Sequence, residues 1–164
     1  MQCRLRLVHE TGARKSRLST FRVHSMTARH LTVLHYPPRQ HWHCVEVREP
    51  SWVDVSAAIR QMDDAEFPIV QLSWNDVDSC FDDETSFNIV GGSATGFALF
   101  EFIPGWKFDS PEGGDEDVRL WQSDQGYFCK RRNIIVDIGL VLKLSKVYFE
   151  TGSYDEVRHA CSSR

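Results

Sequence analysis

The sequence has no long hydrophobic run. Its longest uncharged apolar stretches, such as residues 134–136 and 139–142, are much shorter than the roughly 18 to 20 residues that span a bilayer. The first 25 residues also lack the apolar run of about 7 to 15 residues that a secretory signal requires. We therefore expect a cytoplasmic protein with no membrane-spanning segment.

Cysteine is sparse and widely spaced. The chain has five, Cys3, Cys44, Cys80, Cys129 and Cys161, at spacings of 41, 36, 49 and 32 residues. No Cys-x-x-Cys pair is present, and an odd number does not form a complete disulfide framework. The pattern predicts reduced thiols.

What the chain does contain is enough apolar material for one core. Its 164 residues are 41% hydrophobic and 12% aromatic, which excludes a disordered or low-complexity protein. The length is that of a single domain, and no disulfide or metal is needed to hold it together.

Charge is distributed unevenly along the chain. Residues 1–50 carry nine Lys and Arg against three Asp and Glu, whereas residues 51–164 carry ten against twenty. We interpret residues 1–40 as a basic extension. It is either a flexible segment or the result of a translation start assigned too far upstream, since Met26 offers a second initiation point. The main domain is then expected at 41–160. A basic arm of this kind can bind nucleic acid through phosphates, but charge blocks are more often solvated tails.

Two clusters of carboxylates lie between apolar segments. The first contains Asp76, Asp78, Asp82, Asp83 and Glu84, and the second contains Asp109, Glu112, Asp115, Glu116 and Asp117. They are either solvated loops that keep the protein soluble or a docking face for a basic partner. Trp74 and Trp106 lie next to the clusters. Each is a candidate anchor at such a face, with a place in the core as the alternative.

Periodicity predicts the elements. Strands are expected at residues 41–47, 67–74, 87–90, 97–103 and 118–122, with a further edge strand at 127–129. Ser51 and Asp54 predict the start of a helix that ends near Asp63. A second helix is predicted from Asp137 to Gly152, which stands where a left-handed residue ends a helix. Together they predict a two-layer α+β fold, with an antiparallel sheet of five to six strands and both helices on one face.

Catalytic motifs are missing. His41 and His43 would share one face of a strand, but no carboxylate or thiol at ligand spacing completes a metal site. The glycine-rich segment 91–96 lacks the Lys-Ser/Thr of a phosphate loop and fits a β-turn better. We therefore expect a protein that is not an enzyme and that uses no metal and no cofactor.

The closing segment carries a family resemblance. Residues 133–137 (Asn-Ile-Ile-Val-Asp), the helix ending in residues 147–152 (Val-Tyr-Phe-Glu-Thr-Gly), and residues 153–157 resemble the end of the first immunity-protein family of bacterial polymorphic toxin systems. The segments 86–92 and 97–102 resemble the central hairpin of that family. The strand at 118–122 and the helix at 51–63 also fall where the family has them, so the resemblance covers residues 41–160.

The resemblance implies an antidote. Such proteins bind the toxin domain and block its active site, and their toxins include nucleic-acid deaminases delivered by contact-dependent or type VI secretion. An acidic surface would then imitate the charge of nucleic acid and speed association with the toxin. The toxin-binding residues are expected among Trp74, Trp106 and the ten clustered carboxylates.

The chain departs from the family pattern in two places. His159 stands where the family usually has a tryptophan, and residues 1–40 have no counterpart. Two other functions stay open. One is a small nucleic-acid-associated regulator that acts through the basic arm, and the other is an enzyme with an unrecognised polar pocket.

Overall fold

The computed structural model describes residues 27–76, 85–101, 105–121 and 126–162. The strands are β1 (His30–His35), β2 (His43–Arg48), β3 (Ile69–Ser73), β4 (Phe87–Gly92), β5 (Gly96–Phe100), β6 (Asp117–Trp121), β7 (Tyr127–Lys130) and β8 (Ile134–Ile135). The helices are α1 (Trp52–Gln61), α2 (Ile138–Thr151) and α3 (Tyr154–Ser162), with a 3₁₀ turn at Arg131–Asn133.

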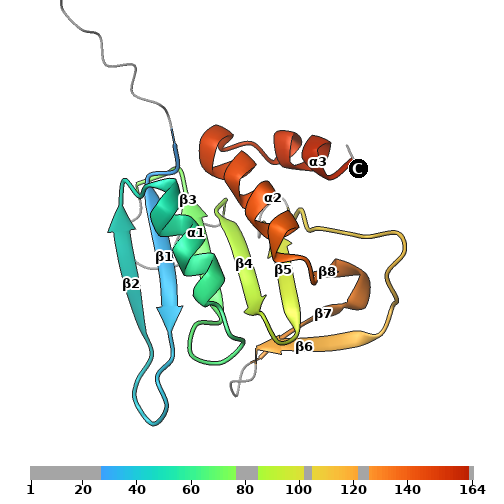
Figure 1. Cartoon of the computed structure of the whole chain (residues 1–164), viewed down its shortest axis with the longest axis horizontal. Coiled ribbons are helices and arrows are strands. Elements are labelled where there is room, and N and C mark those ends of the chain that lie inside the picture. Colours follow the sequence, from blue (N-terminus) through green and yellow to red (C-terminus); the bar gives the residue numbers. More distant parts are fainter. Residues whose placement is uncertain (1–26, 77–84, 102–104, 122–125, 163–164) are drawn as a thin grey trace, which may run out of the picture.

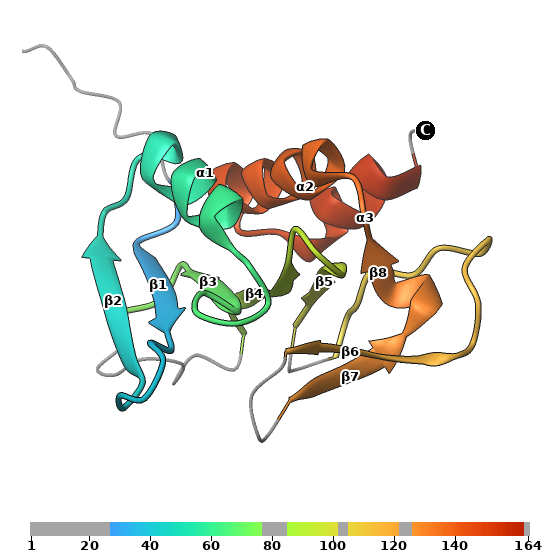
Figure 2. The ribbon, with the colours of Figure 1, turned by 60° about the horizontal axis from the view of Figure 1, so that its bottom comes forward.

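Six strands form one sheet in the order β2-β1-β3-β4-β5-β8. Every neighbouring pair is antiparallel. The helices cover one face of this sheet, as Figures 1 and 2 show. The predicted α+β fold, with helices on one face of an antiparallel sheet, is therefore confirmed.

The opposite face is divided between apolar and polar side chains. At the β4–β5 end, the separate β6–β7 ribbon packs on it through a second apolar cluster of Val90, Ala98, Phe100, Leu120 and Ile134. Elsewhere the face is polar: Gln71 Nε2 donates to Ser86 Oγ at 2.5 Å and to Asn88 Oδ1 at 3.2 Å. All three residues are buried, so these hydrogen bonds offset the cost of desolvating amides and a hydroxyl.

The first helix begins as its sequence predicts. Ser51 Oγ accepts from the Asp54 backbone N–H, and the Asp54 carboxylate accepts from the Ser51 backbone N–H in return. This reciprocal capping box satisfies amides that the first turn leaves open. Val55, Ala58, Ile59 and Met62 are buried in the main core, which confirms the predicted apolar face.

The α2 helix also has the predicted ends. Asp137 is its N-cap and accepts from Gly139 N at 2.8 Å. Gly152 ends it with φ of 63°, in the left-handed region. Between them Val141, Leu144, Tyr148 and Phe149 are buried against the sheet.

The N-terminal boundary of the domain differs from the prediction. We expected the extension to reach residue 40, but β1 lies inside the sheet between β2 and β3, and Leu31 and Val33 are core residues. Residues 1–26 lie outside the described part of the chain.

Two short elements, β8 and α3, were not predicted from the sequence. Cys44 on β2 is disulfide-bonded, which corrects the expectation of a reduced thiol for this residue.

Candidate functional site

The second acidic cluster lies on residues 109–117, beside the turn that follows β7. Figure 1 shows this segment running around the β8 edge of the sheet. Its backbone is fixed there because Ser110 N donates to Arg132 O, Arg132 N to Gly114 O and Arg131 N to Glu116 O. A Cβ at Gly113 would overlap the Arg132 backbone, so only glycine permits this close approach.

The end of β7 and the turn that follows it supply three cations. Lys130 Nζ lies 2.8 Å from Asp117, Arg131 Nε lies 3.2 Å from Glu116, and Arg132 contacts both Asp109 and Asp115 at 3.4 and 3.1 Å. Glu112 is exposed and has no cationic partner among the residues that the structure describes. Each exposed pair adds little stability, with typical values of about 0 to 1 kcal/mol. The larger effect of these ion pairs is on the electrostatic potential of the surface, because the three cations reduce the negative potential of the five carboxylates.

Trp106 packs at the border of the core. Its ring lies 6.3 Å from the ring of Phe87 and 5.3 Å from that of Tyr154, and its side chain is only partly buried. The residue thus has a packing role and also an accessible surface close to the 109–117 segment in sequence.

Trp74 follows β3 and packs under the end of α2. Its Nε1–H donates to Tyr148 O at 3.1 Å. A Cβ at Gly152 would lie 2.8 Å from the indole ring. Trp74 therefore supports the helix end, although it too is only partly buried.

Of the first acidic cluster, only Asp76 is described. Its carboxylate pairs with Arg29 at 3.1 Å and lies 3.7 Å from His30 Nε2. Asp78, Asp82, Asp83 and Glu84 lie outside the described residues. The toxin-binding role of both clusters and both tryptophans stays a prediction.

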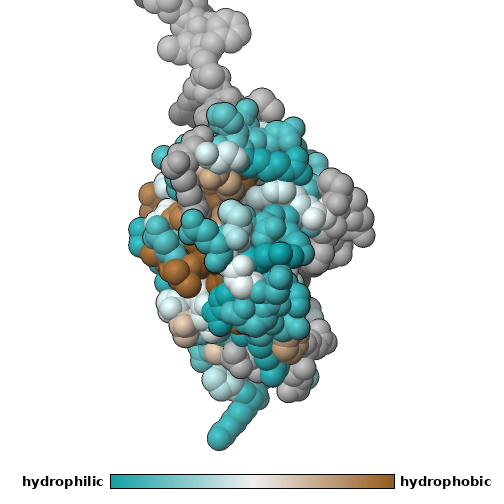
Figure 3. Space-filling model, turned by 90° about the vertical axis from the view of Figure 1, so that its right-hand side faces the viewer, coloured by the Kyte–Doolittle hydropathy of each residue, from teal (hydrophilic) through white to brown (hydrophobic). Residues whose placement is uncertain are grey.

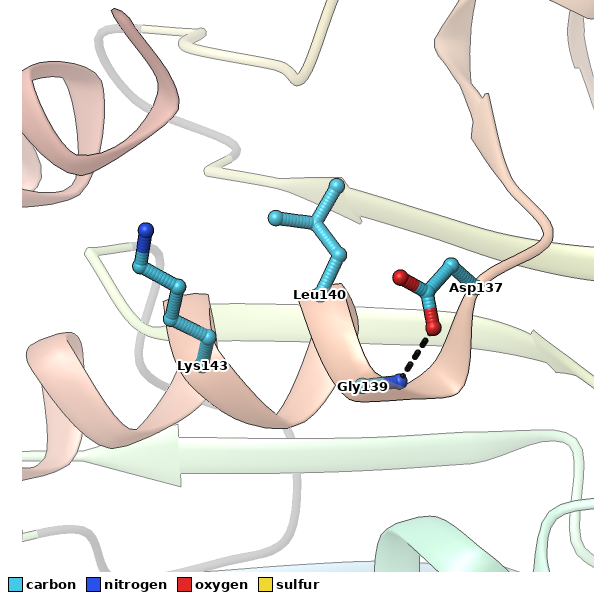
Figure 4. A pocket seen from close by; sticks show the side chains of 4 residues that line it. All are labelled: Asp137, Gly139, Leu140 and Lys143. Atoms are coloured by element: carbon cyan, nitrogen blue, oxygen red, sulfur yellow. Dashed lines mark hydrogen bonds between the residues drawn. The ribbon is translucent and has the colours of Figure 1, made fainter. Parts of the chain in front are cut away.

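An open pocket of about 440 Å³ lies at the start of α2, lined by Asp137, Gly139, Leu140 and Lys143. Figure 4 shows Leu140 and Lys143 pointing to the same side of the helix, while Asp137 holds the Gly139 amide. Figure 3 shows a group of apolar side chains at one margin of this end of the molecule, and Val136, just before the helix, is 79% exposed. The lining therefore offers one carboxylate, which already caps the helix, and one amine, that of Lys143.

Four titratable groups that are buried or partly buried have raised pKa values. Burial raises the pKa of Asp64 and of Glu101, and for Glu101 hydrogen bonding by the Trp106 backbone and the charge of Arg158 oppose the shift. Burial also raises the pKa of Tyr127 to about 12 and that of Cys129 to about 11. Cys129 is therefore a protonated thiol at neutral pH and a poor nucleophile.

The histidine arrangement differs from the one that the sequence indicated. His41 precedes β2, and the partner of His43 is His35, directly opposite it in the β1–β2 register. His35 Nδ1 and His43 Nε2 are 3.3 Å apart. Sequence analysis missed His35 because a partner across a hairpin is found from the strand register and not from local spacing.

Larger ligand sets are missing from the described residues, which contain no group of three or more His, Cys, Asp or Glu side chains placed to hold a metal ion. The glycine-rich segment 91–96 contains the turn between β4 and β5, as predicted: residues 93–95 form the turn, and Gly92 pairs with Gly96 at the strand ends. In the described part of the chain, no helix is long and apolar enough to cross a bilayer.

No family model, curated protein or solved structure matches the chain.

Proposed function

We propose that this protein is a cytoplasmic immunity protein that binds a cognate secreted toxin domain and neutralises it by masking the active site. The favoured toxin acts on nucleic acid, with a deaminase as the first choice. The protein works stoichiometrically, without cofactor or catalysis. The observation that carries the proposal is the closing segment, which resembles the immunity family in sequence and folds into β8 and the α2 helix ending at Gly152.

The element order supports the same proposal. An early helix, a central hairpin and a closing helix are the elements in which the resemblance lies, and α1, β4–β5 and α2 occupy those positions. The segment after Gly152 continues as α3, where Val157 is fully buried and His159 is exposed. His159, which stands where the family usually has a tryptophan, is thus exposed, and any contact that it makes with a partner would be made at the protein surface.

The docking surface is the 109–117 segment with Trp106 at its border. Toxins that act on nucleic acid carry positive surfaces for phosphates, and a negative surface would steer association with them. The paired cations of residues 130–132 moderate this field. They also hold the carboxylates in place, which lowers the entropy lost on binding.

The test is co-expression with the C-terminal domain of the toxin encoded immediately upstream. We expect cells to survive only when this chain is present, and the two proteins to elute as a stoichiometric complex. A harmless neighbour, or one that does not bind, contradicts the proposal. Salt-dependent binding of the chain to DNA or RNA, lost when translation begins at Met26, would instead support the nucleic-acid regulator.

A matched pair of charge reversals tests the surface. Asp115→Lys with Glu116→Lys changes the docking segment, while Glu46→Lys with Glu150→Lys makes the same change in net charge on β2 and α2. We expect the first pair to slow association at least tenfold at low salt and the second to change it less than threefold. Equal effects would remove the 109–117 segment from the interface.

A further inference from the structure

The geometry points to a site for a divalent transition-metal ion of the zinc class, held by the imidazoles of His35 and His43 at the closed end of the β1–β2 hairpin. This site is independent of the proposed toxin-binding surface. Imidazole nitrogen is a preferred ligand of zinc and its neighbours in the periodic table.

The distance between the two nitrogens fits such an ion. Zinc bonds imidazole nitrogen at about 2.0 to 2.1 Å with tetrahedral angles, which places two such nitrogens about 3.3 to 3.4 Å apart. His35 Nδ1 and His43 Nε2 are 3.3 Å apart. As a hydrogen bond the contact is long, since N–H donors in proteins usually lie about 2.9 to 3.0 Å from their acceptors.

The His35 ring is held in position before any ion binds, and the exposed His43 ring rests against it. The His35 ring stacks on Phe67 with centroids 4.5 Å apart and planes 7° from parallel. The His43 ring meets it edge-on, at 70°. The next residue, Tyr36, donates its backbone N–H to Glu66 O at 2.7 Å, which ties this end of β1 to the loop before β3.

The site is open to solvent on the His43 side. His43 is exposed and His35 is half-buried, so an ion can enter without unfolding the hairpin. Two coordination positions then remain for water, because the described residues offer no third ligand. Residues 36–42 connect His35 to His43. A bound ion would join the two ends of this seven-residue connection, in addition to the backbone pairing of β1 with β2.

Zinc binding to the full chain is measured by isothermal titration calorimetry and by thermal unfolding with and without Zn²⁺. The variants are His35→Gln and His43→Gln, and His159→Gln on the distant α3 is the matched control. We expect each hairpin variant to weaken this binding step at least tenfold and to lose the Zn²⁺-induced rise in Tm, while the control keeps both. Mg²⁺, which prefers oxygen ligands, should leave Tm unchanged.

The imidazole resonances locate the ion. Zn²⁺ should shift the ring signals of His35 and His43 together in an NMR titration of the wild-type chain. If His43→Gln binds Zn²⁺ as tightly as the wild type, or if the wild type binds none, the two rings form a hydrogen-bonded pair only and the proposal is overturned. Because His43 is exposed, its variant should fold, which keeps the test valid even if His35→Gln loses its stacking on Phe67.

Discussion

Asp64 is a carboxylate in a place that suits a neutral group better. It is buried, adopts a positive φ of 65°, and accepts the Thr95 backbone N–H on Oδ2 at 3.0 Å. Its Oδ1 is buried with no hydrogen-bond partner in the described part of the chain. Burial raises its pKa, and hydrogen bonds from Thr95 and from the Ala94 backbone oppose this shift without cancelling it, so the ionised form costs free energy in the folded state.

We therefore expect Asp64→Asn to fold normally and to be as stable as the wild type at pH 7, or more stable by up to about 1 kcal/mol. Asparagine keeps one oxygen for Thr95 and tolerates positive φ. The measurement is the free energy of unfolding in urea. A loss of more than about 1 kcal/mol would show that both carboxylate oxygens are needed.

The pH dependence has a definite sign. A raised pKa in the folded state means that the native protein binds this proton before the unfolded chain does. The wild type should therefore gain stability relative to Asp64→Asn as the pH falls from the raised pKa to the ordinary aspartate value of about 3.9. A difference in unfolding free energy that stays constant from pH 7 to pH 4 would contradict the assignment.

At the scale of residues, the sequence predicts a feature when the interactions that cause it lie within a few residues along the chain. Ser51, Asp137 and Gly152 could be predicted as helix ends because capping involves residues within one turn. The shifted groups Asp64 and Glu101 could not, because their burial depends on segments distant in sequence.

At the scale of elements, α2 depends on both of its ends. Gly152 has left-handed φ, and a Cβ there would meet the Trp74 ring at 2.8 Å. We expect Gly152→Ala to lower the unfolding free energy by about 2 kcal/mol or more, from backbone strain together with displacement of Trp74. Gly139→Ala, in the first turn of the same helix, is the control and should stay within about 0.5 kcal/mol. Equal losses in urea unfolding would argue against the Trp74 contact.

The α1 capping box makes a smaller contribution. Ser51→Ala removes the side-chain acceptor for Asp54 N and should cost about 1 kcal/mol in urea unfolding. Ser56→Ala in the middle of the same helix loses a hydroxyl that bonds the Val53 carbonyl, but it gains helix propensity. We expect its change to be within about 0.5 kcal/mol. A Ser51 variant as stable as the Ser56 variant would mean that the cap contributes little.

The elements that the sequence did not predict share a physical reason. Five of the six residues of β1 are buried, including the polar His30 and Thr32, and their burial depends on strands that are distant in sequence. The strand also lies among basic residues and before Pro37, which suggested a tail. Helix α3 has only one buried residue, Val157, so its apolar stripe is too short to be recognised. By contrast, α1, α2 and the β4–β5 hairpin carry full periodic patterns and local turn signals.

At the scale of the whole molecule, the sequence could predict the sign of the charge on the 109–117 segment but not its partners. The basic triplet 130–132 is separated from it in sequence by β6 and β7, and the antiparallel pairing of these strands brings the two together. The acidic surface that the sequence indicates is therefore a surface of mixed charge, and its net field is smaller than the count of carboxylates implies.

Because arginines pair with these carboxylates, the docking proposal predicts that removing the arginines will speed association with the toxin. Arg131→Gln with Arg132→Gln removes the partners of Glu116, Asp109 and Asp115 and leaves the carboxylates in place. If a negative surface steers association with a basic toxin, the double variant should associate several-fold faster than the wild type at low ionic strength. The gain should disappear at high salt, because steering is screened.

The measurement is the association rate constant over a series of salt concentrations. Arg60→Gln with Lys143→Gln is the control, because it makes the same change in net charge on α1 and α2 and should leave the rate within twofold. A slower rate for the Arg131 and Arg132 variant would mean that the arginines contact the partner themselves. The 109–117 segment would then act through matched ion pairs across the interface, and imitation of nucleic-acid charge would no longer explain how it binds.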